Sequence, residues 1–167
     1  SFQSITKVHK SNGNKALLRT HTCGELRAEN VDQEVTLCGW VDSTRDHGGA
    51  VFIDLRDRYG KSQVVAAPQA GVPLVESASR LRSEDVILAK GLVAMRPEGT
   101  VNDKLSTGEV ELRVTHLEVL NRSQTPPFTP GQPDLPGEDL RLKYRFLDLR
   151  RPEVQRAMYL RSRIVKS

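Results

Sequence analysis

Aromatic residues make up only 5% of this 167-residue chain, so its core has to be built from aliphatic side chains. No apolar run approaches the roughly 20 residues that a membrane-spanning helix needs, so no membrane partner is expected. Cys23 and Cys38 are the only cysteines and lack C-x-x-C spacing, and the four histidines add no ligand spacing. We therefore expect no metal site and two structural thiols in a reducing compartment.

Acidic residues are missing from the first 22 positions, which carry four Lys or Arg. Residues 141–167 are also basic, with nine Lys or Arg against two acids, whereas residues 23–140 hold twelve bases and nineteen acids. The net charge of +4 thus conceals an acidic body between two basic ends. Nucleic-acid binding has to be argued from individual side chains, because the overall charge does not support it.

Catalytic motifs are also missing: there is no Ser-His-Asp set, Gly-rich phosphate loop or metal motif. Asp54, Arg56, Asp57 and Arg58 alternate in charge. We interpret them as structural or as a docking surface, because nothing orients them toward a nucleophile. The sequence predicts no catalytic and no cofactor-binding residue.

Five segments have the apolar alternation of strands, at 34–44, 50–56, 62–67, 86–95 and 110–120. Residues 73–82, between the third and fourth segments, have helical spacing of apolar residues. Three strands, a short helix and two strands is the order of an OB-fold, a five-stranded Greek-key barrel. We therefore predict a mainly β OB-fold barrel, with another small barrel as the alternative.

Five of the nine prolines lie within residues 123–139, which predicts an extended, semi-rigid linker. The predicted organisation is a basic N-terminal extension at 1–22, a barrel domain at 23–122, a linker at 123–140, and a last segment at 141–167. We expect a basic, turn-like stretch at 140–151 and a helix from Pro152. No helix-ending Gly or Pro follows, so we expect the last segment to be the truncated start of a further domain.

Phe52 lies on the polar side of the second strand, because its neighbours Val51 and Ile53 face the core. An outward aromatic near Arg45 and Gln63 is suited to stacking a splayed base and bonding its edge. The Watson–Crick edge of uracil alternates acceptors and a donor, which glutamine and arginine match. The alternatives are a Phe52 covered by a neighbouring loop and a surface ion pair between Arg45 and the adjacent aspartate.

Glu111 points outward from the fifth strand, by the same alternation. A carboxylate repels phosphate, but it can accept hydrogen bonds from N1–H and N2–H of an unpaired guanine. The alternative is an ordinary solvated strand glutamate.

Two stretches carry a family resemblance: R-D-H-G-G-A-V-F-I-D-L-R-D-R-Y-G at 45–60 and R-L-K-Y-R-F-L-D-L-R-R-P-E at 141–153. Over about residues 19–167 the chain resembles bacterial-type aspartyl-tRNA synthetases, the organellar enzymes included. The resemblance implies that the barrel is the N-terminal anticodon-binding domain of a homodimeric ligase. A class II catalytic domain beyond the linker would join aspartate to tRNA(Asp), using ATP and magnesium. The class II motifs themselves are absent from this chain.

The resemblance also implies roles for single residues. Phe52 would stack on the middle anticodon uracil, while Arg45 and Gln63 would bond to that base. Glu111 would read the first base, a guanine or its queuosine form, and Arg96 is a candidate for the third base or its phosphate.

Two departures from the family pattern are visible. Ser43 and Thr44 stand where the family often has basic residues, so strong backbone contact is not expected there. Residues 1–18 precede the usual start of the family. With the lack of acids in this region, the extension favours the mitochondrial matrix over the bacterial cytoplasm, although a plain basic tail is the alternative.

Two other classes of function remain open. A free-standing OB-fold binder of single-stranded DNA or RNA would use a positive groove, which the acidic body does not favour. A protein–protein module would have no affinity for RNA.

Overall fold

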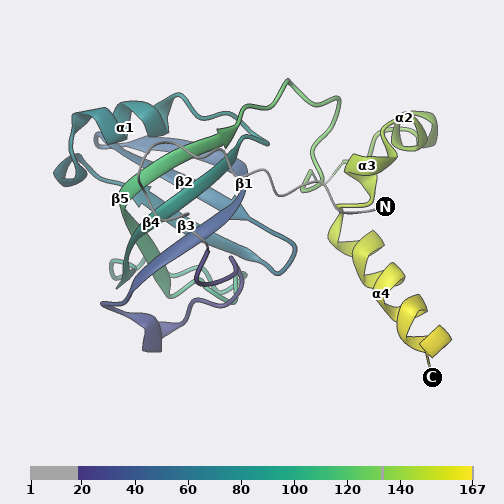
Figure 1. The fold of residues 1–167 in the computed structure, drawn as a ribbon, viewed down its shortest axis with the longest axis horizontal. Helices are drawn as coiled ribbons and strands as arrows, with labels where there is room; N and C mark the ends of the chain where they lie inside the picture. The colour runs from purple at the N-terminus through teal and green to yellow at the C-terminus, as the bar shows by residue number, and fades with distance from the viewer. Residues whose placement is uncertain (1–18, 133, 167) are drawn as a thin grey trace, which may run out of the picture.

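The fold is a closed barrel with the strand order β1-β2-β3-β5-β4, followed by helices to one side (Figure 1). The computed structural model describes residues 19–166 apart from residue 133. The strands are β1 (Glu34–His47), β2 (Ala50–Arg56), β3 (Lys61–Ala66), β4 (Val86–Met95) and β5 (Val110–Asn121). The predicted five-stranded OB-fold barrel is confirmed. Most of the predicted N-terminal extension, residues 1–18, lies outside the described residues.

The barrel closes between β3 and β5, the one parallel pair in the described sheet. This seam consists of the pairs Gln63↔Glu111, Val64↔Leu112 and Val65↔Arg113. β1 is long enough to pair with β4 along its first half and with β2 along its second. At Gly39 a β-carbon would lie 2.4 Å from the Arg56 carbonyl oxygen, so this close approach requires glycine.

The core is aliphatic, as the scarcity of aromatics predicted. Val51, Ile53 and Leu55 of β2 are buried, while the residues between them are only partly buried. Helix α1 (Val72–Ser79) lies between β3 and β4 in sequence and packs against β2, β3 and β5. α1 corresponds to the predicted helix at 73–82, although it ends three residues earlier. Pro73 occupies its first turn, where no amide hydrogen bond is lost.

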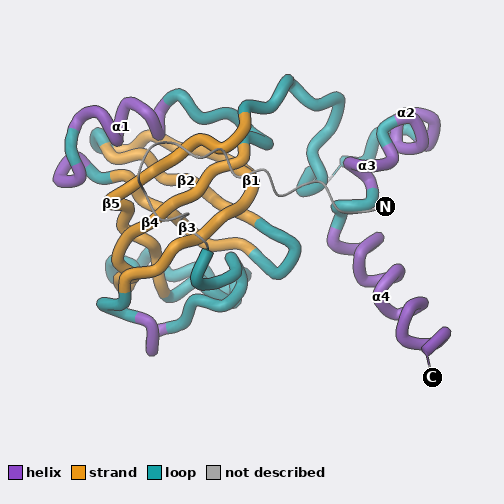
Figure 2. The backbone as a smooth tube through the Cα atoms, viewed as in Figure 1, coloured by secondary structure: helices purple, strands orange, loops and turns teal. Residues whose placement is uncertain are grey.

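The C-terminal part is more helical than predicted (Figure 2). The expectation of a turn-like stretch at 140–151 is wrong, because α2 (Glu138–Lys143) and α3 (Arg145–Asp148) form there. The buried carboxylate of Asp148 favours this folded arrangement, because it pairs with three arginines of the segment. They are Arg141 at 3.9 Å, Arg145 at 2.5 Å and Arg151 at 3.2 Å. The predicted helix from Pro152 is present as α4 (Pro152–Lys166).

Both cysteines are free thiols. Burial raises the pKa of the Cys23 thiol, and the nearby Asp57 carboxylate raises it further, so this thiol stays protonated at neutral pH. Among the described helices, none combines the length and the apolar character needed to cross a bilayer.

Candidate nucleic-acid interface

Four of the five predicted binding residues lie on one outer face of the barrel, across β1, β2, β3 and β5, and the fifth, Arg96, directly follows β4. Arg45 pairs with Phe52 across β1 and β2, and Phe52 pairs with Val65 across β2 and β3. In the adjacent row, Gln63 of β3 is flanked by Asp54 of β2 and by Glu111 of β5. We call this surface the reading face. Its members are Arg45, Phe52, Asp54, Gln63, Arg96, Glu111 and Arg113.

A chain of hydrogen bonds connects the polar side chains of the reading face. Gln63 is at its centre: its Nε2 donates to Glu111 Oε2 at 3.1 Å, and its Oε1 accepts from Arg45 Nη2 at 3.5 Å. The other carboxylate oxygen of Glu111 accepts from Arg113 Nε at 3.3 Å. Gln63 is 7% exposed and Glu111 is 4% exposed, whereas the side chain of Arg45 is 60% exposed. The centre of the network is therefore fixed and its edges are open to a ligand.

One of the alternatives from the sequence is excluded, and another is present with a different partner. Glu111 is not a solvated strand glutamate, because it is buried and accepts two hydrogen bonds. Arg45 does form an exposed ion pair, but with Asp54 across the strand at 3.4 Å. Phe52 is half-buried, and no ring or cation lies against it within the described part of the chain. A stacking surface on Phe52 is therefore not taken by another aromatic of the barrel.

Arg96 follows β4 and is only 8% exposed. Its Nε donates to the carbonyl oxygen of Val110 at 3.1 Å, while its buried Nη2 has no hydrogen-bond acceptor. Burial lowers the pKa of this guanidinium, and the nearby carboxylates of Asp54 and Glu111 oppose that shift. A buried donor without an acceptor is costly, so Arg96 Nη2 is a group that a carbonyl or phosphate oxygen would satisfy.

Two members of the reading face, Asp54 and Arg113, were not predicted as binding residues. Asp54 accepts from Ser43 Oγ at 2.8 Å as well as from Arg45. Both have the strand parity of a predicted reader, Asp54 two positions after Phe52 and Arg113 two positions after Glu111. That parity was the signal available in the sequence.

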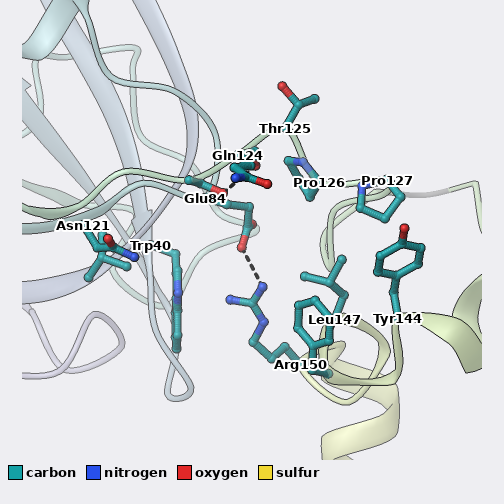
Figure 3. Close-up of a pocket in the computed structure, with 13 residues that line it drawn as sticks. Trp40, Glu84, Asn121, Gln124, Thr125, Pro126, Pro127, Tyr144, Leu147 and Arg150 are labelled. Atoms are coloured by element: carbon teal, nitrogen blue, oxygen red, sulfur yellow. Dashed lines mark hydrogen bonds and ion pairs between the residues drawn. The ribbon is translucent and has the colours of Figure 1, made fainter. Parts of the chain in front are cut away.

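A second polar cluster lies where the barrel meets the C-terminal helices (Figure 3). A cavity of about 630 Å³ is lined by Trp40 and Glu84 on the barrel side and by Tyr144, Leu147 and Arg150 on the helical side. We call Trp40, Arg56, Glu84 and Arg150 the junction.

The junction is held together by one buried carboxylate and two guanidinium groups. Glu84 forms ion pairs with Arg56 and, at 3.0 Å, with Arg150. The guanidinium carbons of the same two arginines lie 5.8 Å and 5.0 Å from the centre of the Trp40 ring. The charged groups of the junction are thus paired with one another, although the buried Nε of Arg150 has no hydrogen-bond acceptor, and we interpret the junction as an internal contact. This agrees with the predicted structural role of Arg56.

No group of three or more His, Cys, Asp or Glu side chains in the described residues could hold a metal ion.

Curated relatives of high similarity are aspartate–tRNA(Asp/Asn) ligases. That of Rhodopirellula baltica is 64% identical over 151 residues, which are 90% of this chain and 26% of the ligase. That of Moorella thermoacetica is 52% identical over 155 residues, 93% of this chain and again 26% of the ligase. The chain thus spans about a quarter of the length of these relatives.

Solved structures and a family comparison agree with the fold. The asparaginyl-tRNA synthetase of Pyrococcus horikoshii, complexed with asparaginyl-adenylate, is 26% identical with a TM-score of 0.76. The match covers 90% of this chain and 33% of that one. Residues 35–120, which include all five predicted readers, match the tRNA anti-codon family, described as an OB-fold nucleic acid binding domain. The chain therefore belongs to this family of OB-fold nucleic acid binding domains.

Proposed function

We propose that the reading face binds the anticodon of tRNA(Asp). Phe52 stacks on the middle uracil, Arg45 and Gln63 bond to the edge of that base, and Glu111 accepts from the guanine at the first position. The observation that carries the proposal is the buried hydrogen bond between Gln63 and Glu111 beside a half-buried Phe52. Gln63, Glu111 and Phe52 thus present donors, acceptors and a ring from rigid strands. Contacts between such groups and the edges of bases specify sequence.

Arg96 is proposed to contact the third base or its phosphate, through the Nη2 atom that lacks an acceptor. The relatives are named for both aspartate and asparagine tRNAs. The anticodons of those two tRNAs share their first two bases and differ at the third. Acceptance of tRNA(Asn) by this protein would therefore depend on the surroundings of Arg96.

The parent protein is proposed to be a homodimeric class II ligase that joins aspartate to tRNA, with ATP and magnesium supplying the activation chemistry. We propose that residues 23–122 are its recognition domain, 123–140 its linker, and 141–167 the start of its catalytic domain. No residue of this chain is assigned to ATP or aspartate. We expect the purified chain to show no aspartate-dependent ATP–pyrophosphate exchange, and measurable exchange would overturn this division of roles.

For location, the bacterial cytoplasm replaces the mitochondrial matrix as our proposal. The relatives reported above are bacterial and do not support the mitochondrial assignment. The argument for mitochondria rested on residues 1–18, which lie outside the described residues.

A competition experiment tests the function. A labelled anticodon stem-loop with the sequence GUC is displaced from the chain by unlabelled loops with each base at the middle position. We expect the uracil loop to compete best, since a good base contact discriminates by about 1–3 kcal/mol. Equal competition by all loops and by an unstructured strand would favour a sequence-neutral OB-fold binder. Absence of any RNA binding would favour a protein–protein module.

A further inference from the structure

The two ends of the Gln63 amide are held by partners of opposite hydrogen-bonding character. Arg45, which contacts Oε1, can only donate. Glu111, which contacts Nε2, is a carboxylate paired with Arg113 and can only accept. Rotating the amide by a half turn would place donor against donor and acceptor against acceptor. The neighbours therefore fix which way the Gln63 amide points.

This orientation matters because uracil and cytosine present opposite patterns at the same edge. Uracil offers the N3–H donor beside the O4 acceptor, while cytosine offers the N3 acceptor beside an N4–H donor. An amide that pairs with one of these edges has to be reversed to pair with the other. After its two protein contacts, Gln63 still has one N–H and one oxygen lone pair for a base.

We propose that Glu111, together with Arg45, sets the direction of the Gln63 amide and so selects uracil over cytosine at a base that Glu111 does not touch. This inference rests on the proposed anticodon function and extends it. Glu111 would act as a contact for the first base and as a positioning residue for the middle base.

The geometry of the seam supports this positioning role. Gln63 and Glu111 are direct partners in the parallel β3–β5 pair, so both side chains project from strands and not from loops. Arg113 holds the second oxygen of Glu111 and limits rotation of the carboxylate. Both side chains are more than nine-tenths buried, so water competes little for their hydrogen bond.

The decisive variant is Glu111→Gln, which keeps the size of the side chain. Its amide can donate or accept, so it no longer enforces one direction on Gln63. The full chain is titrated with two stem-loops that share G and C at the outer positions and have uracil or cytosine in the middle. The substitution changes the interaction with guanine equally for both loops, so the ratio of the two Kd values isolates the middle base.

We expect the wild-type chain to prefer uracil about tenfold or more, and Glu111→Gln to lose about tenfold of that preference. Glu118→Gln is the matched control, since Glu118 is an exposed glutamate further along the same strand. It should leave the ratio unchanged. Without RNA, the NMR signals of the Gln63 side-chain amide should move in Glu111→Gln and stay in place in the control, while both variants melt cooperatively.

The results of the titration distinguish a failure of this inference from a failure of the proposed anticodon function. If the wild type prefers uracil and Glu111→Gln keeps the full preference, Glu111 does not position Gln63 and the inference is overturned, while the anticodon function stands. If the wild type does not distinguish the two loops, the proposed function itself fails and the inference falls with it.

Discussion

The reading face and the junction are built from the same chemical groups but differ in what those groups contact. Each has an aromatic ring, arginines and a buried carboxylate on or beside the barrel. In the junction, both arginines that pair with Glu84 also lie near the ring of Trp40. On the reading face, Phe52 has no such cation among the residues that the structure describes, and within the same residues Arg96 forms no ion pair, whereas Arg150 of the junction pairs with Glu84.

The difference separates a contact completed within the protein from one left open to a ligand. The charged groups of the junction pair with one another, although Arg150 Nε has no hydrogen-bond acceptor, so a change there should appear mainly in stability. On the reading face, the ring of Phe52 and the Nη2 atom of Arg96 can still contact a ligand, so a change there should appear mainly in recognition. Burial alone does not tell the two regions apart, because Glu84 and Glu111 are about equally buried.

Removing the carboxylate of the junction should have the largest effect. We expect Glu84→Ala to lower the free energy of unfolding by about 3–5 kcal/mol, because it leaves the largely buried guanidinium of Arg150 without a counter-charge and removes one of the two carboxylates, Glu84 and Asp42, that pair with Arg56. Urea unfolding measures this, with the exposed Glu118→Ala as control. A reduction below about 1 kcal/mol would mean that the junction behaves as a surface ion pair.

Removing the ring of the reading face should weaken binding without unfolding the barrel. Stacking on an aromatic side chain contributes about 1–3 kcal/mol per base, so Phe52→Ala should raise the Kd for the GUC stem-loop roughly five- to 150-fold. Phe146→Ala, an exposed aromatic of α3, is the control. If Phe52→Ala abolishes cooperative melting, Phe52 belongs to the core and the comparison fails.

Gln63→Ala should affect selectivity more than affinity. Base-edge contacts specify sequence, while phosphate contacts position the RNA without reading it. We therefore expect the preference for a middle uracil to fall by about 1–3 kcal/mol in a competition series, with a smaller change in affinity for the best loop. Equal weakening toward every loop would show that Gln63 is not a reader.

The basic C-terminal segment should have the smallest effect, limited to salt dependence. Arg141, Arg145 and Arg151 pair with Asp148, so they are poor candidates for phosphate contacts. The exposed arginines of α4 remain, at positions 156, 161 and 163. Replacing these three by glutamine should flatten the slope of log affinity against log salt by about 0.7 to 0.9 for each phosphate that they neutralise.

The middle-uracil preference should survive that triple substitution. An unchanged slope would instead assign α4 to contact with the rest of the parent protein. Substitution is a cleaner test than deletion of residues 141–167, because deletion would also remove Arg150 from the junction.

The sequence predicted the barrel well because its strands alternate clearly and end in turn residues. The bounds of β2 and β4 match the prediction, whereas β1 runs on to His47 through polar residues that carry no apolar alternation. The small helices α2 and α3 were missed because the helical spacing in this segment is carried by charged pairs, such as Arg145 and Arg151 with Asp148, and not by apolar residues.

The sequence was sufficient to predict which face of the barrel carries the candidate site. Strand parity places Phe52, Gln63 and Glu111 outward, and the structure brings them together. Parity does not give the register of the β3–β5 pair, so neither the Gln63–Glu111 hydrogen bond nor the burial of the two side chains could be foreseen. The pairing of Glu84 with Arg150 joins positions far apart in sequence and left no local signal.

The parallel seam of the barrel also has a consequence for how the chain folds. The β1–β2–β3 hairpins join near neighbours in sequence, while the seam joins residues 48 positions apart, such as Gln63 and Glu111. Closing a longer loop costs more chain entropy, and non-local contacts slow folding. We therefore expect the seam to be among the late contacts to form. A nascent or partly folded chain would have its hairpins but no assembled recognition surface, so selective RNA binding would report that the barrel has closed.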